Sequence, residues 1–193
     1  MVAEAARVAV LVEGESDREA VLALASARGA DLGAVEVVAM GGATNVARYV
    51  AELGPAGRGL RLTGLYDAGE ERFARRGLER GGLDPAAGRD GLATLGFHCC
   101  DRDLEDELIR ALGVDAVLEV IEAQGDLAHL RGLQQQPAQR ERAPADQLHR
   151  FFGSGSGRKI RYGRLLVEAL DDTRVPAPLS RVLGDALDGT IPA

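Results

Sequence analysis

The sequence predicts an α/β fold with a central parallel sheet of about four strands flanked by helices. Four short apolar runs alternate with segments whose apolar residues recur at the three- and four-residue spacing of amphipathic helices. Each run is too short for a buried helix, and strands that alternate with helices form parallel sheets through right-handed crossovers. The predicted strands are residues 8–12, 35–40, 60–66 and 92–99.

The first strand leads into an acidic turn and a helix. Glu13 and Gly14 follow the strand, and Ser16 and Glu19 have the spacing of a capping box, so we expect a helix from about Asp17 that Gly29 ends. Ligands of open parallel sheets bind beyond the carboxyl ends of the strands, where Glu13 and Asp17 would converge. Ordinary structural roles are an alternative: a carboxylate stabilises any helix N-terminus, and a turn residue is often solvated.

Acidic residues also follow the later strands. Asp67 ends the third strand, with Gly69 two residues later. After the fourth strand, Asp103 is a plausible N-cap of a helix in which Leu104 and Leu108 are buried and Glu105 lies on a different face. Acidic side chains are thus expected at three strand ends.

The second half of the chain is predicted to be helical. Apolar spacing indicates helices over residues 114–123, 127–133, 147–152, 160–170 and 176–187. We divide the chain into an α/β core, residues 1–124, and a helical extension, residues 125–193, which completes the domain and carries Lys159.

Length and composition limit the class of protein. A chain of 193 residues with 46% hydrophobic content can bury one core and a small extension. No apolar run approaches the roughly 20 residues of a membrane span, and the N-terminus lacks signal-peptide features, so we expect a cytoplasmic protein without a membrane partner. Adjacent Cys99 and Cys100, the only cysteines, predict neither a disulfide framework nor a zinc site.

Charge is unevenly distributed. The net charge is −7, yet residues 129–164 contain seven arginines and the only lysine, Lys159, against Glu141 and Asp146. Such a segment is usually a solvated surface, but it is also where a phosphate-bearing partner would bind. A lysine in a chain that otherwise uses arginine is suggestive of a compact point charge with a specific role.

The order of the acidic motifs resembles the Toprim domain, the catalytic fold of topoisomerases, primases and certain nucleases. The motifs are Glu13-Gly14-x-x-Asp17, Asp67-x-Gly69 and Asp103-Leu104-Glu105. The chain is most similar to the Toprim domain of OLD-family endonucleases, and this resemblance rests on Gly42-x-x-Asn45, Asp103-Leu104-Glu105-Asp106, Lys159 before Ile160-x-Tyr162-x-x-x-Leu166, and the Val175-Pro176 helix. Because no P-loop sequence occurs, we expect a free-standing relative whose candidate partners are a separate ATPase and, in a homodimer, a second copy of the chain.

The resemblance implies a nuclease that hydrolyses phosphodiester bonds of DNA with Mg²⁺ or Mn²⁺. It assigns Glu13 and Asp67 as core metal ligands or general base, Asp17 as a second acid, Asp103 and Glu105 as a later metal-binding pair, and Lys159 as a residue that stabilises charge on the phosphate. Carboxylate oxygens suit Mg²⁺, and two such ions could activate water and stabilise the leaving oxygen. The residues predicted to contact the phosphate backbone, without reading bases, are Arg140, Arg142, Arg158, Lys159 and Arg161.

Gly69 departs from the family pattern, which has Asp-x-Asp after the third strand. Glu70 could take the place of the second Asp through a one-residue shift; otherwise the site is weakened, or the chain is a non-catalytic module that binds nucleic acid or a partner. A phosphoacceptor signalling domain ranks last, because that fold has its lysine at the end of a fifth strand and Lys159 begins a helical pattern. His98, His129 and His149 are not assigned to the site, because a lone histidine is usually an ordinary core or surface residue.

Overall fold

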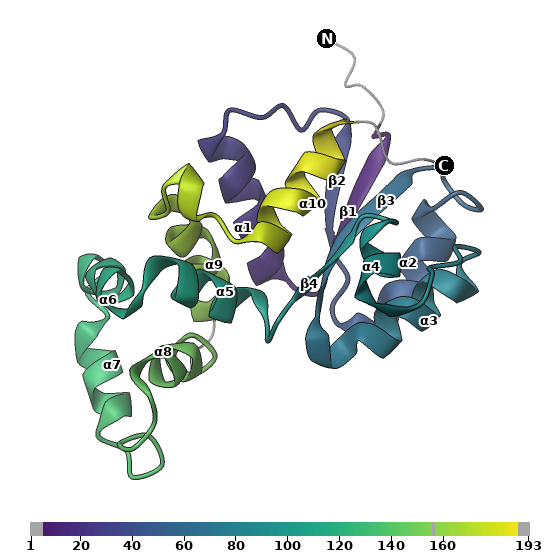
Figure 1. Ribbon diagram of the computed structural model, residues 1–193. Coiled ribbons are helices and arrows are strands. Elements are labelled where there is room, and N and C mark those ends of the chain that lie inside the picture. The colour runs from purple at the N-terminus through teal and green to yellow at the C-terminus, as the bar shows by residue number, and fades with distance from the viewer. Residues whose placement is uncertain (1–5, 156, 189–193) are drawn as a thin grey trace.

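A computed structural model describes residues 6–155 and 157–188 of the chain. Its centre is a four-stranded sheet in which every neighbouring pair is parallel and the strand order is β2-β1-β3-β4 (Figure 1). This confirms the predicted parallel α/β architecture. The strands are β1 (Val8–Val12), β2 (Val35–Ala39), β3 (Arg61–Asp67) and β4 (Phe97–Cys100).

The register of the sheet brings the carboxyl ends of the strands to one edge. Val8 pairs with Val35 on one side and Arg61 on the other, so β1, β2 and β3 start together. Asp67, the last residue of β3, lies opposite Cys100, the last residue of β4. Residues that follow these strands therefore share one end of the molecule.

Each face of the sheet is covered by its own set of helices, which divide the core in two. Val8, Val10 and Val12 of β1 face one cluster, whereas Ala9 and Leu11 face the other. Helices α1 (Glu15–Ala27), α9 (Arg158–Glu168) and α10 (Ala177–Asp188) belong to the first side, and α2 (Val46–Leu53), α3 (Glu71–Arg80) and α4 (Gly88–Ala93) to the second (Figure 1). Burial on both faces explains why β1 is apolar throughout.

A group of short helices extends to one side of the sheet. Helix α5 (Leu104–Leu112) leaves β4, and α6 (Val114–Ala123), α7 (Leu127–Gln134) and α8 (Pro144–Phe152) follow it before the chain returns through α9 (Figure 1). We call α6, α7 and α8 the helical arm. Leu148, Phe151 and Phe152 of the arm are buried with Tyr162 of α9, so the arm is packed onto the returning chain.

The start of α1 differs from the sequence prediction. The helix begins at Glu15 with Gly14 at its N-cap, and Oδ2 of Asp17 accepts a hydrogen bond from the Gly14 N–H at 2.9 Å. Ser16 is buried inside the first turn. The predicted capping box of Ser16 and Glu19 is therefore wrong, because the carboxylate of Asp17 closes the turn two residues earlier. The predicted end is confirmed, since Gly29 follows the C-cap with φ +61°.

The fourth strand is shorter than predicted. Leu92 belongs to α4, and β4 begins only at Phe97. Leu92 is fully buried, but it belongs to a helix. An apolar run alone does not distinguish a buried helix from a buried strand. Among the described residues, no helix is long and apolar enough to cross a membrane.

Candidate metal centre

Three carboxylates meet at the carboxyl edge of the sheet. Glu13 directly follows β1, Asp67 ends β3, and Glu70 ends the 3₁₀ turn Ala68–Glu70 that comes next. One oxygen from each lies within 4.8 Å of the others. We call Glu13, Asp67 and Glu70 the carboxylate triad. The triad brings two of the predicted ligands together and adds Glu70, the residue after Gly69.

The surroundings of the triad disfavour the ionised forms of Glu13 and Asp67. Burial, followed by the hydrogen bond and charge of Glu70, raises the pKa of Glu13 to about 7. Burial, followed by the charges of Asp17 and Glu13, raises the pKa of Asp67 to about 8. A divalent cation would relieve this repulsion, and three converging carboxylates are a suitable donor set for Mg²⁺ or Mn²⁺.

Asp17 lies beside the triad in the first turn of α1. Burial and then the charge of Glu105 raise the pKa of Asp17 to about 7, although the hydrogen bond from the Gly14 N–H acts in the opposite direction. The same hydrogen bond fixes the turn that carries Glu13. Asp17 therefore shapes the turn at the end of β1 and adds negative charge near the triad.

Lys159 and Glu105 form an ion pair at the edge of the site. Lys159 is in the first turn of α9 and Glu105 in the first turn of α5, and Nζ lies 3.1 Å from Oε2. The Glu105 side chain is 5% exposed, whereas that of Lys159 is 50% exposed. Burial lowers the pKa of Lys159, but the carboxylate of Glu105 outweighs it, so the pKa is raised and the ammonium stays charged at neutral pH.

Asp103 is the N-cap of α5, as predicted, and also contacts the helical arm. Its Oδ1 accepts from the Asp106 N–H at 2.8 Å, and its Oδ2 lies 2.5 Å from Nε2 of His149 in α8. Burial would raise the pKa of Asp103, but the hydrogen bonds from His149 and Asp106 lower it below its usual range. No spacing in the sequence predicts His149 as a residue of the site, because only the folding of the chain brings α8 next to Asp103.

The predicted phosphate-contacting arginines already have partners within the protein. The Arg158 guanidinium lies 4.2 Å from the centre of the Phe151 ring, and Arg161 pairs with Asp126. Arg140 and Arg142 lie between α7 and α8 at the end of the helical arm and donate to backbone carbonyls. Of the predicted basic contacts, the structure joins Lys159 alone to an acidic residue of the predicted site within the described part of the chain.

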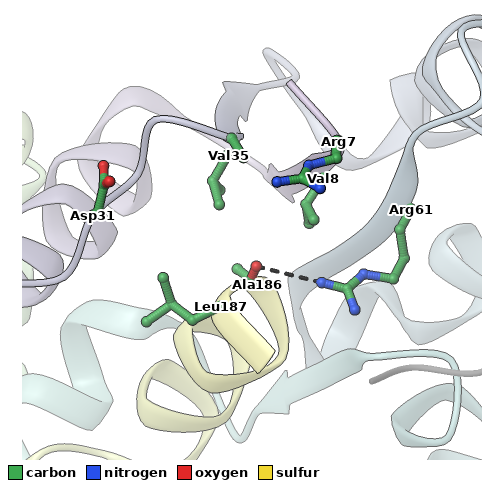
Figure 2. Close-up of a pocket in the computed structure, with 8 residues that line it drawn as sticks. Arg7, Val8, Asp31, Val35, Arg61, Ala186 and Leu187 are labelled. Atoms are coloured by element: carbon green, nitrogen blue, oxygen red, sulfur yellow. Dashed lines mark hydrogen bonds between the residues drawn. The ribbon is translucent and has the colours of Figure 1, made fainter. Parts of the chain in front are cut away.

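A cavity of about 420 Å³ lies where the strands of the sheet begin (Figure 2), whereas the triad lies where they end. Val8, Val35 and Arg61, the first residues of three strands, line it together with Leu187 near the end of α10. Arg61 donates to the carbonyl of Asp185 at 2.9 Å and so attaches α10 to β3. The cavity is thus separate from the carboxylate triad.

Among the comparisons with known proteins, only solved structures give matches. No protein-family model matches the sequence, and no curated protein sequence matches it. Among solved structures, the C-terminal region of the Burkholderia pseudomallei OLD protein is 23% identical with a TM-score of 0.70, covering 95% of this chain and 98% of that one. The C-terminal region of the Xanthomonas campestris pv. campestris OLD protein is 26% identical with a TM-score of 0.71, covering 95% and 93%. The predicted resemblance is therefore confirmed: this chain has the Toprim-like α/β fold of the C-terminal region of OLD proteins.

Proposed function

We propose that this chain is a nuclease that hydrolyses phosphodiester bonds of DNA with Mg²⁺ or Mn²⁺. The observation that carries the proposal is the carboxylate triad, in which oxygens of Glu13, Asp67 and Glu70 lie within 4.8 Å of one another. The triad lies where parallel sheets bind ligands, beyond the carboxyl ends of the strands. A cluster of acids alone is common on protein surfaces, so the resemblance to OLD proteins supplies the second support.

The residues present fit a divalent metal. Glu13, Asp67 and Glu70 would hold it through hard carboxylate oxygens, which is the ligand type that Mg²⁺ and Mn²⁺ prefer. Burial and then neighbouring carboxylates raise the pKa values of Glu13 and Asp67, and a bound cation would favour their ionised forms. When bound, the metal would supply Lewis acidity toward a phosphate and toward water.

Lys159 is the cation best placed to act on a phosphate near the triad. Half of its side chain is exposed, and Glu105 holds its ammonium at the rim of the site. A charged amine there would bind a non-bridging phosphate oxygen and stabilise negative charge that develops on it. Asp17 contributes by fixing the Gly14 N–H and with it the turn that carries Glu13.

The position of Glu70 favours catalysis over a non-catalytic module. Gly69 removes a carboxylate from the family pattern, but the 3₁₀ turn Ala68–Glu70 brings the next side chain back to Glu13 and Asp67. Gly69, the residue that suggested a non-catalytic module, is thus followed by a carboxylate, Glu70, that takes part in the triad. The resulting site keeps three carboxylate donors.

For DNA we propose contacts to the phosphate backbone and none to base edges. Arg140 and Arg142 are exposed at the end of the helical arm, and neither forms an ion pair with a described residue. Both could bind phosphate without breaking an internal ion pair, whereas Arg161 would have to leave Asp126. A separate ATPase and a second copy of the chain as partners stay predictions.

The test is conversion of supercoiled plasmid to nicked and linear forms with Mg²⁺ or Mn²⁺. We expect cutting by the wild type and, in Glu13→Gln, Asp67→Asn and Glu70→Gln, a loss larger than the roughly 10- to 100-fold that follows when a partner of a metal ligand is removed. Glu52→Gln, on the exposed face of α2, is the matched control and should cut normally. Retention of DNA without cutting by the wild type would instead identify a non-catalytic binding module.

A further inference from the structure

His149 links the helical arm to the edge of the carboxylate site. Its Nε2 lies 2.5 Å from Oδ2 of Asp103, and the residues come from α8 and from the N-cap of α5. The His149 side chain is 23% exposed and that of Asp103 18%, so the contact is largely shielded from water. A short hydrogen bond in such surroundings fixes the orientation of both side chains.

Arg102 favours the tautomer of His149 that directs a donor at Asp103. Its Nη2 lies 3.4 Å from Nδ1 of His149, and its Nη1 pairs with Asp146 at 2.8 Å. A guanidinium only donates hydrogen bonds, so it favours the tautomer in which Nδ1 has no proton and Nε2 carries one. Nε2–H then donates to the Asp103 carboxylate.

Helix capping does not require this second hydrogen bond. Oδ1 of Asp103 already accepts the Asp106 N–H and satisfies the start of α5, whereas Oδ2 is used by His149. After burial and the larger effects of other carboxylates, the charge of Asp103 also raises the pKa values of Asp67 and Glu13, so Asp103 acts on the triad as a smaller contributor. Its orientation therefore affects the electrostatics at the triad.

We propose that His149 is a positioning residue: by holding Oδ2 of Asp103 through Nε2–H, it sets the geometry of the carboxylate site and hence its affinity for a divalent cation. The inference rests on the metal centre of the proposed function. It assigns the helical arm a role in the site, since two side chains of α8 one turn apart contact the two residues that precede α5, Asp146 to Arg102 and His149 to Asp103. Partners that orient metal-binding carboxylates typically change metal affinity 10- to 100-fold when removed.

The experiment measures Mn²⁺ binding to the full chain by electron paramagnetic resonance, with thermal unfolding in the absence of metal as the control for folding. His149→Leu removes the donor, His149→Gln keeps an amide N–H at a similar reach, and Asp146→Asn weakens the neighbouring link between α8 and α5 without removing the donor. We expect His149→Leu to weaken Mn²⁺ binding by roughly 10- to 100-fold, and His149→Gln and Asp146→Asn to stay close to the wild type.

When the wild type binds Mn²⁺, the outcomes separate this inference from the proposed function. Equal Mn²⁺ affinity in His149→Leu and the wild type overturns the positioning role and leaves the metal centre standing. Equal weakening in His149→Gln and His149→Leu overturns it too, because the donor would then not be the cause. A wild type that binds no Mn²⁺ refutes both. The expected affinities in a protein that cuts no plasmid would support the positioning role and refute the nuclease.

Discussion

Substitution of Gly163 by Ala tests how closely the two helices of the site are packed. Gly163 is in α9, one turn after Lys159, and faces the first turn of α1. A Cβ atom there would lie 2.6 Å from the carbonyl oxygen of Ser16 and 3.2 Å from its carbonyl carbon. Both are backbone atoms, which cannot rotate away. The helices would have to separate until the shortest contact reaches about 3.4 Å, the lower limit of ordinary contact.

The expected loss follows from two opposing terms. Overpacking of a close contact destabilises a protein by about 1–3 kcal/mol, and Ala in place of Gly in a helix returns up to about 1 kcal/mol. Because the contact of 2.6 Å is to a backbone atom, we take the upper part of the overpacking range, about 2–3 kcal/mol. The net loss is then roughly 1–2 kcal/mol, which corresponds to a decrease in Tm of about 2–8 °C for a chain of this size. Since α1 carries Asp17 and α9 carries Lys159, plasmid cutting should fall as well.

Thermal unfolding followed by circular dichroism measures this effect, and Gly132→Ala in α7 is the matched control. A Cβ atom at Gly132 meets nothing within 4 Å, so that variant should match or exceed the wild type in Tm. If Gly163→Ala melts at or above the temperature of the wild type, the close contact between α1 and α9 is not rigid. The reasoning that Gly163 permits the approach of these helices would then be refuted.

Three further predictions concern the charges of the site. The native pKa values of Glu13, Asp17 and Asp67 are raised to about 7, 7 and 8, so the metal-free folded state binds more protons than the unfolded state, and its stability in urea should fall from about pH 4 to about pH 8. Mn²⁺ should reduce this fall in stability, and a flat profile without metal would contradict the assignment. Gly69→Asp adds a carboxylate into open space, so the protein should fold and bind Mn²⁺ more tightly in electron paramagnetic resonance titrations. An unchanged affinity for Mn²⁺ would mean that the added carboxylate does not reach the triad. Glu105→Gln should lower the pKa of Lys159, which nuclear magnetic resonance can follow as a single signal because no other lysine is present. An unchanged pKa would show that the ion pair with Glu105 does not stabilise the charged form of Lys159.

The fold was largely predictable because its signals are local. Apolar runs located β1, β2 and β3, glycines located helix ends such as Gly29, and the alternation of elements indicated parallel strands. Prediction failed where one local sequence pattern is compatible with two different structures. Leu92 is buried from a helix instead of a strand, and a carboxylate at Asp17 started α1 earlier than the expected cap at Ser16.

The site was predictable only in part. Glu13 and Asp67 follow from strand ends, since the parallel register brings these ends together whatever the intervening residues are. His149 could not be found in this way. It lies 46 positions from Asp103 and reaches it through the packing of α8 on α5, which leaves no spacing pattern in the sequence.

Glu70 shows why the motif alone was insufficient to judge the site. A motif counts residues along an assumed backbone, and Gly69 seemed to leave a gap because the expected acid belongs at that position. The chain instead turns through a 3₁₀ segment after Asp67, and this turn brings the side chain of residue 70 to the triad. Metal chemistry requires oxygen atoms at suitable positions in space, and a changed turn can supply them from a neighbouring residue. The number of carboxylates at the triad, and not the match to the motif, is therefore the better guide to whether this chain binds a metal.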